Sequence, residues 1–149
     1  MSGEPVVILL VEDDPAHAEI VRRSFINFRM ANRPVQLVHV VDGQDALDYL
    51  FSRGKFQPPV FSPRPNLILL DLRLPKVDGL EVLKIVKEDA DLVNIPVVVL
   101  TTSSAEADKA KAYESHANSY LVKPMDLSQF NKLMDALGYY WLVWNQYPF

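Results

Sequence analysis

Residues 6–14 read VVILLVEDD, an unbroken apolar run followed at once by three acidic side chains. A strand that is apolar on both faces is typical of a parallel sheet covered by helices on either side. Similar runs lie at residues 67–70, directly before Asp71, and at residues 97–100, directly before Thr101. These runs predict the centre of an α/β sheet, with polar side chains where its strands end.

Strands and helices are expected to alternate five times along the chain. Strands are expected at residues 6–12, 36–41, 67–71, 97–101 and 119–122. Helices, with apolar side chains at three- and four-residue spacing, are expected at residues 15–28, from 43, at 79–89, at 105–116 and from 127. This alternation predicts one domain over residues 1–149, in which right-handed crossovers place helices on both faces of a parallel sheet.

The composition argues against several classes of protein. The net charge is −4, with no cluster of basic residues, whereas binding to a nucleic-acid backbone needs clustered Lys and Arg. The absence of cysteine excludes disulfides and thiolate metal sites. No apolar run approaches the roughly 20 residues of a membrane span, and the N-terminus lacks the pattern of a signal peptide. We therefore expect a cytoplasmic protein with no nucleic-acid or membrane partner.

Acidic side chains are expected to converge at one edge of the sheet, because parallel strands all end there and α/β proteins bind ligands at that edge. Glu12, Asp13 and Asp71 would meet at this edge. Carboxylates this close need a compensating charge, and Mg²⁺ prefers oxygen ligands while keeping several waters. Asp13 and Asp71 are the best direct ligands, and Glu12 is expected to act through water. Asp14 is expected to cap the helix that follows.

Asp71 is also the best candidate for a nucleophile. Its carboxylate can attack phosphorus and form an aspartyl phosphate, and catalysis of phosphoryl transfer rests mainly on positioning and cationic clamps. Lys123 follows the strand expected at 119–122 and supplies a compact positive charge. Thr101 offers a hydroxyl donor from the end of a neighbouring strand. Four side chains from distant parts of the chain thus predict a phosphoryl-acceptor site.

Together these motifs resemble the receiver domain of two-component response regulators. The matching segments are LVEDD at 10–14, LLDLRLP at 69–75, DG at 78–79, PVVVLT at 96–101 and YLVKP at 120–124. The resemblance implies a doubly wound, flavodoxin-like sheet of five parallel strands in the order 2-1-3-4-5. It also implies a single-domain response regulator in phosphorelay signalling, in which Asp71 accepts a phosphoryl group from the phosphohistidine of a sensor histidine kinase.

The resemblance assigns roles to the residues around Asp71. It implies that Asp13 and Asp71 bind Mg²⁺ together with the backbone carbonyl of Arg73, and that Glu12 assists. Arg73 and Ser103 occupy positions that vary in the family and tune the lifetime of the phosphate.

The resemblance also implies a conformational switch. Thr101 and Lys123 would hold the phosphoryl oxygens, and Tyr120 matches the aromatic position whose ring turns inward as Thr101 moves toward the phosphate. The Lys123–Pro124 peptide is expected to be cis, which only proline makes inexpensive. Phosphorylation would then shift a two-state equilibrium that partners recognise on the face formed by the fourth helix, the fifth strand and the fifth helix.

The three histidines receive no role at this stage. His17, His39 and His116 have neither the spacing of metal ligands nor the pattern of a base beside a nucleophile. We expect them on the surface or on the faces of helices.

The C-terminal segment, about residues 138–149, carries no charge and contains both tryptophans. Several of its side chains fall outside the apolar, inward-facing stripe of the fifth helix. They would expose an apolar, aromatic surface, which is typical of an interface. These residues are Tyr139, Tyr140, Val143, Tyr147 and Phe149. We expect a homodimer through this segment and the face of the fourth helix, fifth strand and fifth helix. The ending also resembles that of small response regulators paired with cyanobacterial phytochrome kinases.

Other functions fit the sequence less well. A phosphohydrolase of the haloacid-dehalogenase type needs a second Asp two residues after the nucleophile, where this chain has Arg73. Neither G-x-G-x-x-G nor the P-loop pattern occurs, which disfavours nucleotide binding. With no output domain expected after the fifth helix, the chain would relay phosphate or bind a target directly, and it would not be a turnover enzyme. A receiver-like binding module that is never phosphorylated is the alternative.

Overall fold

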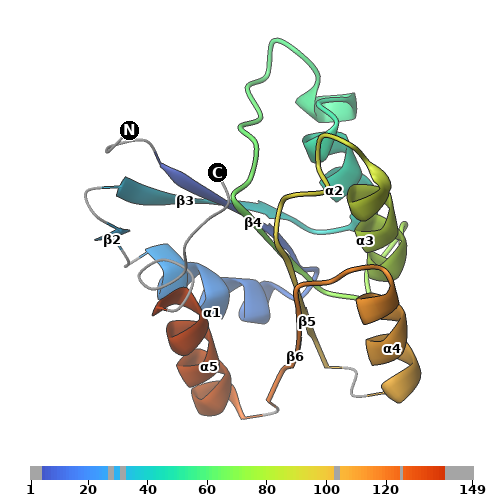
Figure 1. The fold of residues 1–149 in the computed structure, drawn as a ribbon. Coiled ribbons are helices and arrows are strands. Elements are labelled where there is room, and N and C mark those ends of the chain that lie inside the picture. Colours follow the sequence, from blue (N-terminus) through green and yellow to red (C-terminus); the bar gives the residue numbers. More distant parts are fainter. Residues whose placement is uncertain (1–4, 27–28, 31–32, 103–104, 125, 140–149) are drawn as a thin grey trace.

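The computed structural model describes residues 5–26, 29–30, 33–102, 105–124 and 126–139, and the structural statements below concern these residues. Figure 1 shows a central sheet between two layers of helices, with α1 and α5 on one face and α2, α3 and α4 on the other. The helices are α1 (Pro15–Ile26), α2 (Gly43–Leu50), α3 (Gly79–Glu88), α4 (Glu106–Glu114) and α5 (Leu127–Tyr139), with a short 3₁₀ turn, η1 (Gly54–Phe56).

Five parallel strands form the body of the sheet. They are β1 (Val6–Val11), β3 (Arg33–Val40), β4 (Leu67–Leu70), β5 (Val97–Thr101) and β6 (Ser119–Val122). Their spatial order is β3-β1-β4-β5-β6, all paired in parallel. When only these five strands are counted, this is the order 2-1-3-4-5, so the predicted fold class is confirmed.

The edge of the sheet beside β3 differs from the expectation. A two-residue strand, β2 (Arg29–Met30), pairs antiparallel with the start of β3, which begins at residue 33 rather than 36. The first helix is described as far as Ile26, and residues 27 and 28, to which it was expected to extend, lie outside the described residues. Pro34 lies in this pairing opposite Arg29, at the kind of edge position where the missing N–H of proline is tolerated. Two residues are too few to produce a periodic signal in the sequence.

Two apolar cores flank the sheet because successive side chains along each strand point to opposite faces. Ile8 and Leu10 of β1 face α1 and α5, where they join Phe25 and Phe130. Leu9 of the same strand faces α2, α3 and α4 in the second core. The strand interiors are buried on both sides, as unbroken apolar runs predict.

The strand register brings the polar strand ends together. Val11, the last residue of β1, pairs with Leu70, the last residue of β4. The Asp71 amide donates to the carbonyl of Val11 (3.1 Å), and the Lys123 amide donates to the carbonyl of Thr101 (2.7 Å). The backbone itself therefore holds the expected site residues at one edge of the sheet.

Gly79 lets α3 begin in contact with the end of β4. A β-carbon at this position would lie 2.2 Å from the carbonyl oxygen of Asp71 and 2.6 Å from the α-carbon of Leu72. Both contacts are to backbone, which cannot move aside without shifting the loop that carries Asp71. The Gly79 amide also donates to the carbonyl of Leu72 (2.9 Å), which fixes this approach.

We predict that Gly79→Ala lowers the free energy of unfolding by about 2–3 kcal/mol, the cost of overpacking a rigid site. Helix propensity alone would raise stability by up to about 1 kcal/mol, so the sign of the change separates the two effects. Urea unfolding is the measurement. Lys84→Ala, at an exposed position of the same helix, is the control and should stay within about 0.5 kcal/mol of wild type. A stabilised Gly79→Ala variant would contradict the close approach.

Candidate functional site

The acidic stretch after β1 sends its side chains in different directions. The Glu12 amide still donates to Val40 of β3 (3.1 Å), so Glu12 continues the strand and its carboxylate is buried, with 1% exposure. Asp13 is exposed at the mouth of the site. Strand alternation thus separates an inner carboxylate from an outer one.

Asp14 caps α1, as expected from the sequence. Its Oδ1 accepts hydrogen bonds from the amides of Ala16 (2.9 Å) and His17 (3.3 Å). Burial acts to raise the pKa of Asp14, but these two amide hydrogen bonds outweigh it, and the pKa is lowered. The Asp14 amide in turn donates to Glu12 Oε2 (3.2 Å). The cap therefore also fixes one oxygen of the buried Glu12 carboxylate.

Asp71 is buried at the end of β4 with both carboxylate oxygens engaged. Oδ1 accepts a hydrogen bond from the Arg73 amide (3.2 Å), and Oδ2 lies 3.3 Å from Lys123 Nζ. Because each oxygen has a partner from a different segment, the plane of the carboxylate is fixed. This is the orientation that a nucleophilic carboxylate needs.

Lys123 crosses the site from the end of β6, and its side chain is only 1% exposed. Nζ forms a short ion pair with Glu12 Oε1 and lies 3.3 Å from Asp71 Oδ2. Its third neighbour is His17 Nδ1, at 3.1 Å. An ammonium group has three donors and no acceptor, so these three neighbours use all of its hydrogen-bonding capacity.

Burial dominates the electrostatics of Glu12. Desolvation raises the pKa of Glu12 to about 7, the Lys123 ammonium opposes the rise, and the negative charge of Asp71 adds to it. A buried carboxylate with a pKa this high binds a proton more tightly in the folded protein than in the unfolded chain. Burial therefore disfavours the charged form of Glu12 in the metal-free site.

Three carboxylates at the site fit a divalent cation. One oxygen each of Glu12, Asp13 and Asp71 lies within 4.8 Å of the others. When all three are ionised, one ammonium leaves two negative charges, which one divalent cation balances. Hard cations such as Mg²⁺ and Mn²⁺ take oxygen ligands of this kind. The donor set therefore suits a divalent metal ion, with Asp13 on the open side.

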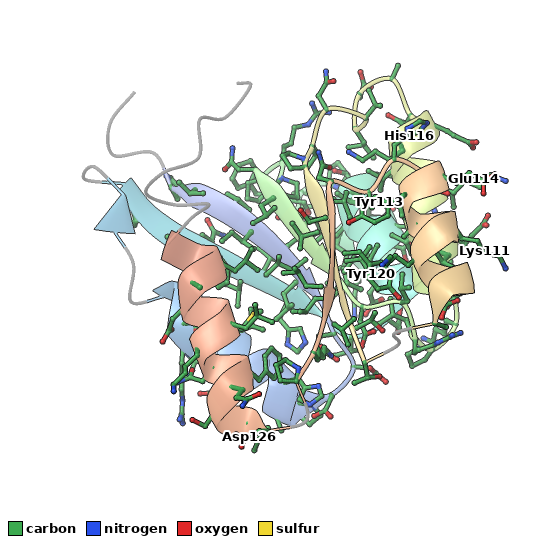
Figure 2. The ribbon with its side chains drawn as sticks, turned by 60° about the horizontal axis from the view of Figure 1, so that its bottom comes forward. Lys111, Tyr113, Glu114, His116, Tyr120 and Asp126 are labelled. Carbon is green, nitrogen blue, oxygen red and sulfur yellow. The ribbon has the colours of Figure 1, made fainter. Side chains whose placement is uncertain are left out.

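Thr101 and Tyr120 lie where the resemblance requires them. Thr101 is fully buried at the end of β5, and Tyr120 pairs with Val99 in the β5–β6 register. Figure 2 places Tyr120 between the sheet and α4, and its ring belongs to the same apolar core as Ala112 of that helix. The ring is thus already buried, while its role as a switch stays a prediction.

His17 and His39 both contact site residues, a role that the sequence analysis did not assign to them. His17 contacts Lys123, and His39 Nε2 lies 2.7 Å from the carbonyl oxygen of Glu12. A helical signal could have shown this for His17, because it lies four residues before Val21 and eight before Phe25 on the inward stripe of α1. His116 is exposed, as expected.

The expected cis peptide before Pro124 is wrong in this structure. Within the described part of the chain the one cis bond joins Pro58 and Pro59, and the Lys123–Pro124 bond is trans. Trans is the intrinsically favoured isomer even before proline. Lys123 reaches Glu12 and Asp71 in this isomer, so the site contacts do not require the cis form.

The Arg73 side chain turns away from the acidic cluster and pairs with Asp108 in the first turn of α4. Its amide stays beside Asp71. The position therefore contributes backbone to the site and an ion pair to α4. The phosphohydrolase alternative would need an acid–base carboxylate at this position, and the guanidinium that stands there cannot act as one.

The predicted interface residues Tyr140, Val143, Tyr147 and Phe149 lie outside the described residues, and the side chain of Tyr139 is likewise not described. Among the described residues, no helix is both long enough and apolar enough to cross a membrane.

Comparison with known proteins identifies the family. Residues 8–135 match the response regulator receiver domain. Response regulator Rcp1 of Synechocystis is 43% identical over 141 residues, which cover 95% of this chain and 92% of Rcp1. The probable methanogenesis regulatory protein FilR2 of Methanothrix harundinacea is 43% identical over 145 residues, 97% of this chain and 89% of FilR2. The chain belongs to the response regulator receiver family.

Solved structures agree with this assignment. The Mn²⁺-bound form of Rcp1 has a TM-score of 0.90 at 42% identity, covering 97% of this chain and all of that one. The phosphorylated cyanobacterial phytochrome response regulator RcpA has a TM-score of 0.88 at 38% identity, covering 99% of this chain and all of that one. The protein is thus a response regulator receiver related to regulators of phytochrome signalling.

We predict that the metal-free Glu12→Gln variant loses less stability than wild type between pH 5 and pH 8. Because the folded-state pKa of Glu12 is raised to about 7 from 4.5, its contribution to stability is present below pH 4.5 and is lost as the pH rises through 7. The variant removes that loss, so its stability relative to wild type should rise by roughly 1–3 kcal/mol between pH 5 and pH 8.

Urea unfolding with chelator present measures this difference at both pH values. Glu81→Gln, at an exposed position of α3, is the matched control and should change stability by less than about 0.5 kcal/mol. A Glu12→Gln variant that is equally destabilised at pH 5 and pH 8 would show that burial does not disfavour the Glu12 carboxylate.

Proposed function

We propose that this response regulator accepts a phosphoryl group on Asp71 from the phosphohistidine of a sensor histidine kinase. The observation that carries the proposal is the buried Lys123 ammonium, which lies 3.3 Å from Asp71 and is held by Glu12. An oxygen of Asp71 attacks phosphorus and forms the acyl phosphate, the N–P bond of the donor breaks, and the imidazole leaves with the electron pair of that bond.

The acidic cluster supports Mg²⁺ as the cofactor. Asp13, Asp71 and the backbone carbonyl of Arg73 would bind it directly, and Glu12 would assist through water. When bound, Mg²⁺ supplies positive charge that screens the acceptor carboxylate from the incoming phosphoryl oxygens. The Mn²⁺-bound form of Rcp1 and the cluster of three carboxylates support a divalent ion of this size and hardness.

Lys123 and Thr101 are proposed to hold the phosphoryl oxygens. Both are buried at adjacent strand ends, and the Lys123 amide bonds directly to the Thr101 carbonyl. A movement of Thr101 toward the phosphoryl group would therefore displace the end of β6, the strand that carries Tyr120. In this way the chemistry at Asp71 reaches the face of α4, β6 and α5, on which partners would recognise the phosphorylated state.

A phytochrome-like histidine kinase is the proposed donor. Support comes from the phytochrome response regulator RcpA, whose solved structure matches nearly the whole chain, and from the bacteriophytochrome response regulator AtBRR, which is 40% identical. FilR2, a probable methanogenesis regulatory protein, is as similar to this chain as Rcp1 is, at 43% identity. The cognate kinase therefore has to be identified by direct phosphotransfer assays. A cytoplasmic location is part of the same proposal, since the donor histidine has to reach Asp71.

We also propose a homodimer through the face of α4, β6 and α5, extended by the aromatic segment at about 138–149. The described part of that face exposes three large apolar side chains, Tyr113 (48%), Val122 (44%) and Leu127 (56%). Tyr113 lies on α4 (Figure 2), Val122 is the last residue of β6 and Leu127 is the first residue of α5. Apolar side chains gathered in this way suit a protein interface.

The proposed unit is one receiver domain over residues 1–149. It catalyses its own phosphorylation and slow dephosphorylation and is no turnover enzyme. It needs no contact with nucleic acid, and its net charge of −4 would oppose such contact. A receiver-like module that works without phosphorylation would not need a buried ammonium beside a fixed carboxylate, so this alternative is not favoured.

Incubation with Mg²⁺ and acetyl phosphate should give a single phosphoryl adduct by intact mass. Asp71→Asn should abolish the adduct, since an amide is a poor nucleophile, and chelator should lower its yield at least about tenfold by removing the positive charge that the cation supplies. The exposed Asp78, whose side chain makes no capping hydrogen bond at the start of α3, provides the control Asp78→Asn, which should phosphorylate normally. An adduct that persists on Asp71→Asn would refute the assignment.

Sedimentation velocity tests the dimer. Wild type should form dimers, whereas Val122→Glu and a chain shortened by its last twelve residues should each weaken the dimer at least about tenfold, since both remove apolar contact area. Val60→Glu, at a similarly exposed valine outside this face, is the control and should dimerise as wild type does. Wild type that stays monomeric at high concentration, with or without phosphorylation, would rule out the interface.

A further inference from the structure

His17 supplies the third neighbour of the buried Lys123 ammonium. Nδ1 of His17 lies 3.1 Å from Nζ, on the side of the lysine that faces α1. The other two neighbours, Glu12 and Asp71, are the acids of the site. Among the described residues within hydrogen-bond distance of this ammonium, His17 is therefore the one that is not a carboxylate.

Nδ1 of His17 has two possible partners, and it can serve only one of them. An ammonium group can only donate, so a hydrogen bond with Lys123 requires Nδ1 to accept and the ring proton to sit on Nε2. Asp14 Oδ2 lies 3.6 Å from the same nitrogen, and a hydrogen bond to it would require a proton on Nδ1. The shorter distance favours Lys123, and thus the neutral ring protonated at Nε2.

The surroundings of His17 fix the ring in place. Its amide donates to Asp14 Oδ1 (3.3 Å) within the cap of α1. The ring packs edge-on against Phe130 of α5, with centroids 5.1 Å apart and planes at 81°. Phe130 is fully buried and its centroid lies 6.0 Å from Lys123 Nζ. The imidazole is therefore held between the two helices that cover this face of the sheet.

We propose that His17 is a positioning residue for Lys123. The inference rests on the proposed function of Asp71 as the phosphoryl acceptor. A lysine side chain is long and flexible, and with only Glu12 and Asp71 as partners its ammonium would be drawn entirely onto the acids. The neutral imidazole holds one donor without adding negative charge beside the acceptor. When Asp71 gains the phosphoryl group, Lys123 can redirect one donor to a phosphoryl oxygen while Glu12 and His17 retain the others.

The protonation of the ring gives a direct test in the unmodified protein. Long-range ¹H–¹⁵N correlation spectra of metal-free wild type at pH 8 should show His17 as the neutral form with its proton on Nε2. His17→Gln identifies the signal by its loss from the three histidines. A proton on Nδ1, alone or together with one on Nε2, would overturn the proposal, since that nitrogen could not then accept from Lys123.

Phosphorylation kinetics test the consequence. With acetyl phosphate and Mg²⁺, His17→Leu should lower the maximal rate of adduct formation at least about tenfold, because a misplaced ammonium costs orientation. The half-saturating Mg²⁺ concentration should hardly change. His17→Gln, whose amide oxygen can accept from Lys123, should recover most of the rate. His116→Leu, at an exposed histidine, is the control.

Two results would overturn the positioning role: a His17→Leu variant as fast as wild type, or a folded His17→Gln variant as slow as His17→Leu. Thermal midpoints of all variants show whether they are folded. Wild type that takes up no phosphoryl group would refute the proposed function instead, and the spectra would still decide whether His17 accepts from Lys123.

Discussion

The burial of one ammonium group between two carboxylates is the interaction on which the rest of this structure depends. Removing a charge from water costs several kcal/mol unless it is paired and hydrogen-bonded. Lys123 meets this condition only because Glu12 and Asp71 approach it from the ends of β1 and β4. Its own position is set by the register of β6 against β5. Correct folding of the sheet and assembly of the site are therefore the same event.

The site is connected to both helical layers through separate contacts. On one face, the cap of α1 fixes Glu12 through the Asp14 amide, and His17 links Lys123 to α5. On the other face, Arg73 pairs with Asp108 of α4. A phosphoryl group on Asp71 would introduce new negative charge among all these contacts. Redistribution of the hydrogen bonds of one lysine is thus a physical route from the chemistry to the outer surface.

The sequence was sufficient for the five parallel strands of the sheet and for the convergence of the site. Unbroken apolar runs mark strands with both faces covered, and parallel strands place Asp71, Thr101 and Lys123 at one edge. The family pattern supplied the strand order, which geometry alone leaves open. Gly79 belongs to the family pattern at residues 78–79. Only the structure shows why a side chain is excluded there: backbone atoms would lie 2.2–2.6 Å from its β-carbon.

Other features lay beyond sequence reasoning for physical reasons. The strand β2 has two residues, which is a single period of a strand and too short to show as a repeating pattern. The isomer of Lys123–Pro124 depends on a small energy difference that the tertiary structure decides. His17 was missed because a search for ligand spacing ignores the possibility that a histidine accepts a hydrogen bond from a buried lysine. Its place on the inward stripe of α1 was the available signal.

The most direct measurement is a crystal structure of the protein with Mg²⁺ and beryllium trifluoride, which mimics the phosphoryl group on an aspartate. The account predicts the fluoride adduct on Asp71, a metal ion between Asp13 and Asp71, and Lys123 Nζ within hydrogen-bond distance of a fluoride while still in contact with Glu12. A Lys123 side chain turned away from the adduct, or an adduct on another residue, would contradict it.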